Sequence, residues 1–235
     1  GGQMAATSVI DNYPGFEEGI EGFDLGQKMK ASADRFGAKT LLGEVFSVDL
    51  QSGIKRIKSS EGSFEAKTVI IATGAAPRKL GLPEEDSLGG RGLAYCATCD
   101  GMFFKGKTVA VIGGGNSAVE DALYLSKICK KVYLIHRRNE LRAASVYKPA
   151  LEKAEHIEIV WNSVVKNILH GSTVTGITVE DTQSGKISDI ACDGVFVAVG
   201  RIPNTGFLNG ALATDKNGYI VADETTQTSI PGVFA

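Results

Sequence analysis

The chain has 235 residues, of which 43% are hydrophobic and 22% are charged, and its formal net charge is -2. This composition is typical of a soluble globular protein with one large or two smaller domains, and the charge gives no reason to expect nucleic acid or an anionic membrane as a partner. No apolar run reaches the roughly 20 residues that span a bilayer, and the first residues do not resemble a signal peptide. The sequence therefore favours a cytoplasmic protein.

The first third of the chain is expected to contain a helix and a small antiparallel sheet. Apolar spacing predicts a helix over 22–36 with one face formed by Leu25, Met29, Ala33 and Phe36. Three β-prone runs follow, at 40–50, 54–59 and 63–66. The apolar run 68–74 then predicts a strand that is buried on both faces of a parallel sheet.

The rest of the chain is expected to begin with a linker. Residues 79–92 are rich in glycine, proline and acidic side chains, which is typical of a connecting segment. A strand at 107–112, a helix at 117–127 and a strand at 132–135 predict a βαβ unit. A helix at 145–154, despite Pro149, precedes the last predicted elements, which are an antiparallel group at 157–161, 174–180 and 186–190 and a closing strand at 195–200.

Two segments indicate an internal repeat. Residues 69–78 and 195–204 share an apolar strand followed by Ala, one residue, Gly, two residues and Pro, and both Gly74 with Gly200 and Pro77 with Pro203 are 126 residues apart. Two related nucleotide-binding domains explain this repeat. Gly113 opens the second copy 87 residues before Gly200, and the same spacing places the turn of the first copy before residue 1. We therefore expect an internal fragment of a longer protein that lacks both ends.

A cysteine pair, Cys96 and Cys99, stands directly before the predicted βαβ unit. In a reducing compartment an isolated C-x-x-C motif indicates redox or metal chemistry, and the remaining cysteines and histidines have no spacing that would complete a zinc site. We predict a redox pair, with Cys129 and Cys192 as buried thiols. Asp100 is placed to exchange a proton with the outgoing thiolate, or else it caps the local turn.

The glycine motif after the strand predicts a dinucleotide site. In Gly113-x-Gly115-x-x-Ala118 the first glycine makes the tight turn, the second lets the backbone approach a pyrophosphate, and the small third residue lets helix and strand pack closely. The amides at the start of the helix then bind the phosphates.

Arginines at the end of the next strand indicate which dinucleotide is bound. The strand ends in His136-Arg137-Arg138, followed by Arg142, where an NAD site would carry an acid for the ribose. Arginine matches a 2'-phosphate, so the sequence favours NADPH, with a solvated basic patch as the alternative. Because a disulfide accepts hydride poorly from nicotinamide, a flavin is expected between the two.

The combination of motifs resembles the low-molecular-weight thioredoxin reductases of the bacterial type. The matching stretches are 1–3, 12–15, 69–78, 96–101, 113–125, 136–138 with 142, 200–204 and 228–235. The resemblance implies a homodimeric α/β flavoenzyme with two Rossmann-like nucleotide-binding domains that carry antiparallel β-excursions. Electrons pass from NADPH to FAD, then to the Cys96–Cys99 disulfide, and then to oxidised thioredoxin.

The resemblance also implies domains and cofactor contacts. An FAD-binding domain at 1–79 and 206–235 is interrupted by an NADPH-binding domain at 80–205 that rotates on hinge strands at 79–92 and 201–206. The residues expected near FAD are Gly1, Gly2, Gln3, Asn12, Val45, Ala72, Thr73 and Gly74. Those expected near NADPH are Gly113, Gly114, Gly115, Asn116, Ser117, His136, Arg137, Arg138 and Arg142, and Gly200 is a further expected cofactor contact.

Other functions compete with this prediction. A related flavoprotein that reduces a peroxiredoxin shares the cysteine pair and both nucleotide folds, but it typically uses NADH, which the arginines disfavour. A non-catalytic NADPH-binding fragment and a zinc-stabilised interaction domain belong to different classes. The order in which the two cysteines act, one facing flavin and one attacking thioredoxin, is left open by the resemblance.

Overall fold

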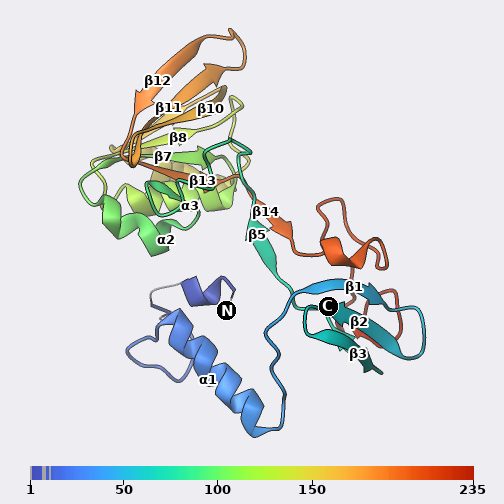
Figure 1. The fold of residues 1–235 in the computed structure, drawn as a ribbon. Helices are drawn as coiled ribbons and strands as arrows, with labels where there is room; N and C mark the ends of the chain where they lie inside the picture. The colour runs from blue at the N-terminus through green and yellow to red at the C-terminus, as the bar shows by residue number, and fades with distance from the viewer. Residues whose placement is uncertain (1, 7–8, 11) are drawn as a thin grey trace. The chain divides into compact units, whose positions relative to one another are not determined.

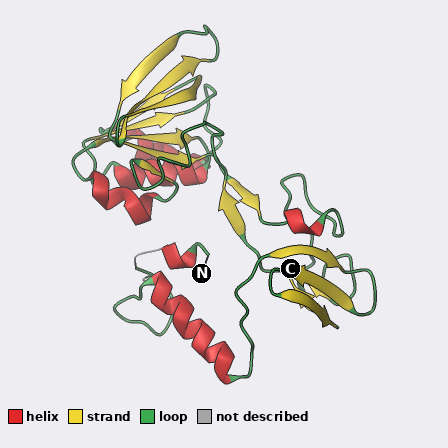
Figure 2. Ribbon diagram, in the orientation of Figure 1, coloured by secondary structure: helices red, strands yellow, loops and turns green. Residues whose placement is uncertain are grey.

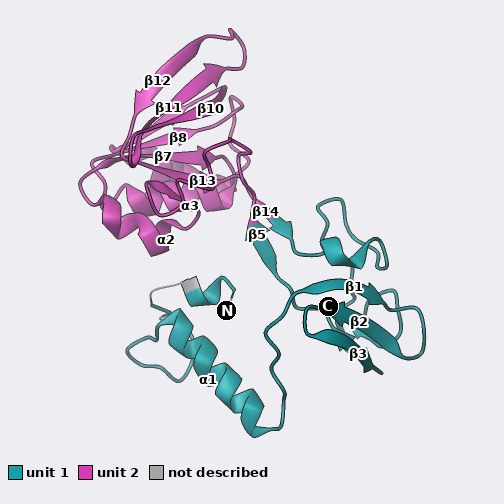
Figure 3. Cartoon of the chain, in the orientation of Figure 1, with its two compact units in different colours: residues 1–76, 202–235 teal, residues 77–201 magenta. Residues whose placement is uncertain are grey.

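The chain folds into two compact units in this computed structural model, which describes residues 2–6, 9–10 and 12–235 (Figures 1 and 3). Unit 1 comprises residues 1–76 and 202–235, and unit 2 comprises residues 77–201. The chain therefore crosses between the units twice, after Ala76 and after Arg201. The strands at these crossings, β5 (Ala75–Pro77) and β14 (Arg201–Pro203), pair with each other.

Unit 1 begins with a short 3-10 helix, η1 (Met4–Ala6), and the helix α1 (Gly22–Arg35). The predicted helix over 22–36 is thus confirmed, but its predicted apolar face is not. Leu25 is buried, whereas Met29 is 40% and Phe36 is 82% exposed. Only the first turn of α1, at Gly22 and Leu25, is buried against the unit, so the apolar spacing continues beyond the contact.

The predicted antiparallel sheet of unit 1 is confirmed. It consists of β1 (Val45–Asp49), β2 (Lys55–Ser59) and β3 (Gly62–Ala66). The predicted buried strand over 68–74 is shorter than expected. It contains only β4 (Val69–Ile70), which pairs in parallel with β15 (Val233–Phe234), and Ile70 is 76% exposed. The core of this unit lies beside that pair and includes Leu50, Ile71, Leu208, Leu212, Ile230 and Val233; the last short helix is η4 (Gly206–Leu208).

Unit 2 is built on a five-stranded parallel sheet in the order β6-β13-β7-β8-β9 (Figures 1 and 2). The strands are β6 (Leu93–Ala94), β13 (Gly194–Ala198), β7 (Thr108–Gly113), β8 (Lys131–Ile135) and β9 (Ile157–Val160). Their apolar runs are buried because one face packs against α3 (Asn116–Leu125) and the other lies against the antiparallel sheet of this unit. The βαβ unit predicted around Gly113 is therefore confirmed.

The later part of unit 2 corrects two expectations. β9 was expected in an antiparallel group, but it joins β8 in parallel because its apolar residues complete the central sheet. The antiparallel sheet instead consists of β10 (Ser163–His170), which the sequence did not predict, β11 (Val174–Asp181) and β12 (Ile187–Ala191). The helix expected over 145–154 is η3 (Ser145–Tyr147) followed by α4 (Lys148–Glu152), with Pro149 in the first turn, where its missing N–H is tolerated.

The segment 79–92, predicted to be a linker, is a folded part of unit 2. Leu88 is fully buried and Glu85 is 2% exposed, because Leu80, Leu82 and Leu88 pack with the core of the unit. Its glycines and acidic residues serve local turns rather than chain flexibility. Across the part of the chain that the structure describes, no helix has the length and apolar character needed to cross a membrane.

Candidate active site

Cys96 and Cys99 form a disulfide in unit 2, with an S–S distance of 2.01 Å. β6 delivers the chain to Cys96, which is the N-cap of α2 (Ala97–Asp100), and its Sγ accepts a hydrogen bond from the Cys99 amide at 3.2 Å. Both cysteines are half-buried. The short helix therefore holds the two sulfurs of the predicted redox pair together at the edge of the unit, and the other two cysteines, Cys129 and Cys192, are buried thiols as expected.

Buried residues anchor the segment that carries the disulfide, and two exposed apolar residues follow it in sequence. Ala97 is 1% exposed, and Phe104 at the end of η2 (Gly101–Phe104) packs edge-on against Phe196 of β13 with ring centroids 5.3 Å apart. Between these anchors Met102 and Phe103 are exposed, at 56% and 75%. Two apolar side chains are thus offered to solvent within a few residues of the sulfurs.

Asp100 is half-buried immediately after Cys99. Burial raises the pKa of its carboxyl above the ordinary value of an aspartate. Among the hydrogen bonds of the described residues, none joins this carboxyl to either sulfur. A carboxyl that keeps its proton to higher pH is suited to proton transfer. Because no hydrogen bond joins it to a sulfur, the acid–base role of Asp100 stays a prediction.

The glycine turn at the carboxyl end of β7 has the shape that a pyrophosphate requires. A Cβ on Gly113 would lie 2.4 Å from the carbonyl oxygen of Ala198 and 2.7 Å from Cβ of Ala118, so only glycine lets strand and helix approach this closely. A Cβ on Gly115 would meet nothing within 4 Å. Gly115 is the N-cap of α3 and makes no side-chain cap, which leaves the first amides of α3, including that of Ser117, to a phosphate group.

The buried side chain of His136 packs against this glycine turn. The side chain is 5% exposed, its Nδ1 lies 3.1 Å from the Gly113 carbonyl oxygen and its Nε2 lies 2.9 Å from that of Glu140. Burial lowers the pKa of His136, and the charges of Arg142 and Arg137 act in the same direction. The ring thus joins the glycine turn to the loop after β8, and its expected contact with the cofactor stays a prediction.

The arginines predicted to select the 2'-phosphate lie on the loop that follows β8. Arg137, Arg138 and Arg142 are exposed, and in residues 2–6, 9–10 and 12–235 none of their guanidinium groups forms an ion pair with a carboxylate. The Arg142 amide donates to the Gly114 carbonyl at 2.7 Å, and the side-chain oxygen of Asn116 accepts from the Ala144 amide at 2.8 Å. The loop is therefore tied to the glycine turn with three cationic groups free to bind phosphate.

In unit 1 the segment that follows β4 makes contacts with residues far away in the chain. The side-chain amide of Gln3 donates to the Ala75 carbonyl oxygen at 2.8 Å, and Thr73 and Asn204 exchange hydrogen bonds of 2.8 and 3.0 Å. Gly74 has a φ of +65°, and a Cβ there would meet nothing within 4 Å. The backbone at Gly74 is open to a ligand, and the expected flavin contacts of Gly2, Ala72, Thr73 and Gly74 stay a prediction.

Other residues expected near a cofactor are not joined to these groups. Asn12 and Val45 are exposed, and the hydrogen bonds of the described chain connect neither of them with Gln3 or the end of β4. The Gly200 carbonyl oxygen accepts from the Arg78 amide at 2.9 Å. Gly1 lies outside the described residues.

Sequence reasoning missed one pair near the disulfide, Glu85 and Tyr95. The Tyr95 hydroxyl donates to the buried Glu85 carboxylate at 2.6 Å, and Tyr95 directly precedes Cys96. A single acid inside an acidic, proline-containing segment gives no periodic signal, so no motif would have distinguished Glu85 from Glu84 or Asp86.

Comparison with known proteins gives a consistent result. The family model described as pyridine nucleotide-disulphide oxidoreductase matches residues 1–235. The thioredoxin reductases of Streptomyces clavuligerus and Bacillus subtilis are 44% and 41% identical to this chain, which is covered completely and spans 74% of each. The crystal structure of Lactococcus lactis thioredoxin reductase in its FR conformation superposes with a TM-score of 0.80 at 38% identity, covering all of this chain and 78% of that one. The chain belongs to the thioredoxin reductases of the pyridine nucleotide-disulphide oxidoreductase family.

Proposed function

We propose that the protein is a thioredoxin-disulfide reductase that uses NADPH and FAD. The observation that supports this function is the Cys96–Cys99 disulfide, which precedes strand β7 and the glycine turn at its end, in a chain related to thioredoxin reductases. FAD, when bound, accepts two electrons from nicotinamide and delivers them to a disulfide. The overall reaction converts NADPH, one proton and the disulfide of thioredoxin into NADP+ and two thiols.

The side chains of unit 2 would each serve one part of this reaction. The Cys96–Cys99 disulfide takes up two electrons and two protons and becomes a dithiol, with Asp100 donating one of these protons to a sulfur and taking it back when that sulfur acts as a thiolate. One thiolate then attacks the disulfide of thioredoxin to form a mixed disulfide, and the second thiol resolves it, which leaves thioredoxin reduced. The three arginines of the β8 loop would bind the 2'-phosphate.

The surface beside the disulfide supports a protein substrate. Met102 and Phe103, which follow α2 within three residues, are exposed, whereas Phe104 is buried. Exposed apolar side chains next to a reactive group favour contact with a partner protein. Phe103→Ala is therefore expected to raise KM for thioredoxin more than it changes the reduction of a small disulfide.

The test is NADPH-dependent reduction of oxidised thioredoxin by the holoprotein. We expect activity in the wild type, and its loss in Cys96→Ser and in Cys99→Ser, because neither single thiol can complete the exchange. Cys129→Ala is the matched control, since its thiol is buried and unpaired. Full activity in either serine variant would contradict the proposal.

The peroxiredoxin-reducing alternative is not favoured, since the relatives above are thioredoxin reductases.

We also infer a homodimer, which the family resemblance supports and which light scattering after gel filtration would test. A cytoplasmic location is consistent with a catalytic disulfide in a reducing compartment and would be tested by fractionation.

A further inference from the structure

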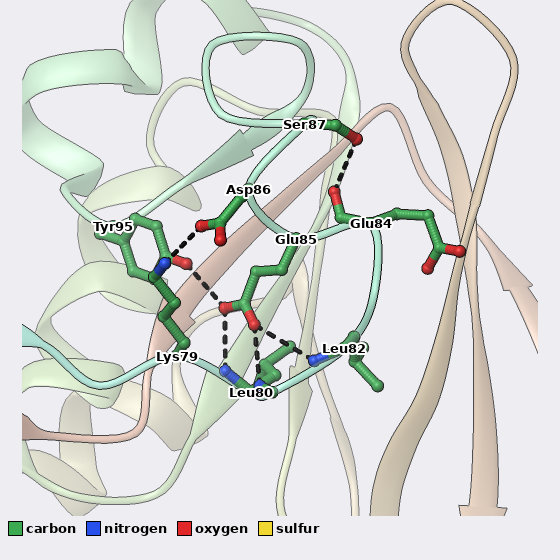
Figure 4. Close-up of polar contacts among 9 residues, drawn as sticks. Lys79, Leu80, Leu82, Glu84, Glu85, Asp86, Ser87 and Tyr95 are labelled. Atoms are coloured by element: carbon green, nitrogen blue, oxygen red, sulfur yellow. Dashed lines mark hydrogen bonds and ion pairs between the residues drawn. The ribbon is translucent and has the colours of Figure 1, made fainter.

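A buried carboxylate, Glu85, joins the first residues of unit 2 to Tyr95, the residue before the disulfide. Glu85 is 2% exposed, and its two oxygens accept four hydrogen bonds (Figure 4). Three come from consecutive amides, those of Leu80 and Gly81 at 2.8 Å and that of Leu82 at 3.4 Å. The fourth comes from the Tyr95 hydroxyl at 2.6 Å.

Hydrogen bonds stabilise the charge of Glu85, and no side chain of the described residues forms an ion pair with it. Burial acts to raise the pKa of Glu85, but the hydrogen bonds from Tyr95 and the three amides outweigh it and hold the pKa below the ordinary value. The same contact and burial raise the pKa of Tyr95. The pair is therefore an ionised carboxylate and a neutral phenol, in which the phenol donates.

The other partner of this contact, Tyr95, directly precedes Cys96 in the chain. Tyr95 lies between β6, whose Leu93 and Ala94 pair with β13, and Cys96, the first residue of the disulfide. The β6 pairing ends at Ala94, and beyond it Tyr95, directly before Cys96, is held by packing against the core of unit 2 and by its hydroxyl contact with Glu85. Loss of the Glu85 contact would remove the hydrogen bond that restrains the side chain directly before Cys96.

We propose that Glu85, acting through Tyr95, is a positioning residue that holds Cys96 in the geometry of the disulfide. The proposal rests on the redox role of the Cys96–Cys99 pair and deepens it. Neither Glu85 nor Tyr95 touches the reacting sulfurs in this arrangement. Their effect is to favour the oxidised form, because a restrained Cys96 keeps its sulfur close to that of Cys99.

The test is the thiol–disulfide equilibrium of the holoprotein with dithiothreitol. In this exchange the dithiol of the reagent attacks the Cys96–Cys99 disulfide, gives it two electrons and two protons, and closes into a cyclic disulfide. Samples at graded ratios of reduced to oxidised reagent are alkylated, and the state of the two cysteines is read by mass spectrometry. Neither thioredoxin nor NADPH is present, so the measurement remains valid even if thioredoxin is not the substrate.

Tyr95→Phe removes only the hydroxyl that reaches Glu85. We expect the ratio of reagent needed for half reduction to fall by about threefold or more, the effect of one hydrogen bond. Asp86→Asn is the matched control, because it disrupts the exposed ion pair with Lys79 on the same segment and leaves both Glu85 and Tyr95 in place (Figure 4). The control should leave the ratio unchanged.

Two results would overturn the proposal. The first is a Tyr95→Phe protein that melts earlier but keeps the wild-type redox equilibrium, which would make the contact merely structural. The second is an equal shift in Asp86→Asn, which would assign the effect to the segment as a whole. Glu85→Gln provides a second test of the same contact. We expect it to lower the reagent ratio for half reduction at least as much as Tyr95→Phe does.

Discussion

The imidazole of His136 occupies the space that a side chain at Gly114 would need. A Cβ on Gly114 would lie 2.1 Å from Nδ1 and 2.2 Å from Cε1 of that ring. The ring is buried and is held between two carbonyl oxygens, so it has little freedom to move away. The glycine turn and the loop after β8 are thus shaped around one buried side chain.

This contact separates the effects of two adjacent glycines. Gly114→Ala must displace the His136 ring and is expected to destabilise unit 2 by about 2 kcal/mol or more, the cost of overpacking. Gly115→Ala meets no protein atom within 4 Å and should keep the wild-type melting temperature. Its methyl group would stand where the pyrophosphate approaches, so NADPH should bind about tenfold more weakly or worse. Thermal melts and titration calorimetry together check both outcomes, and a Gly115→Ala protein with normal affinity would disprove this assignment of the turn.

The arginines of the β8 loop are expected to decide between the two nicotinamide dinucleotides. Replacing Arg137, Arg138 and Arg142 with alanine removes three exposed cations and should raise Kd for NADP+ about a hundredfold or more, because charge-assisted hydrogen bonds to a phosphate are lost. Binding of NAD+, which lacks that phosphate, should change little. Calorimetry with both ligands measures this, with exposed Lys153→Ala as the control. Equal losses for both ligands would show that the arginines do not read the 2'-phosphate.

Asp100 is expected to control the proton that accompanies reduction of the disulfide. Asp100→Asn keeps the shape of the side chain and removes its acidity, so turnover with thioredoxin should fall about a hundredfold. Because burial raises the pKa of Asp100, the wild-type carboxyl stays protonated to higher pH, and the step that uses this proton should slow as pH rises through that pKa. The asparagine variant should lose this limb of the pH profile. An unchanged profile would remove Asp100 from the mechanism, and NADPH affinity serves as the internal control.

Asp121 on α3 provides a pH dependence of stability. Burial raises its pKa from 3.8 to about 6, the charge of Glu120 adds to this, and that of Arg201 opposes it. The folded protein therefore favours the protonated form of Asp121. The stabilisation that this gives to the folded state is complete below about pH 4 and is lost as pH rises to about 6 and beyond. Asp121→Asn should raise the free energy of unfolding at pH 8 by about 1 to 2 kcal/mol, after allowance for the partial exposure of Asp121, with no gain at pH 4.

Urea unfolding between pH 4 and pH 8 measures this difference. Glu152→Gln, at an exposed carboxyl of the same unit, is the control and should show no such gain. A stabilisation by Asp121→Asn that is the same at both ends of the range would contradict the assigned titration.

Features that depend only on residues close together in the chain could be predicted from the sequence. Cys96 and Cys99 lie one helical turn apart, the glycine turn is continuous with its strand and helix, and the arginines follow directly after β8. Strands β7, β8 and β13 of the parallel sheet were predictable because burial on both faces demands an uninterrupted apolar run. Family, cofactors and reaction follow from these local patterns.

Which segments pair with one another depends on the folding of the whole chain. Ile157 and Ile159 show that β9 is a strand, but whether it pairs in parallel or antiparallel depends on a partner elsewhere in the chain. The composition of the acidic segment 79–92 predicts a linker. In the folded chain, however, Glu85 of this segment accepts hydrogen bonds from amides of its own loop and from the hydroxyl of Tyr95. Composition records that a residue is polar, whereas the position of its hydrogen-bond partners, which makes burial of a charge tolerable, is set by the fold.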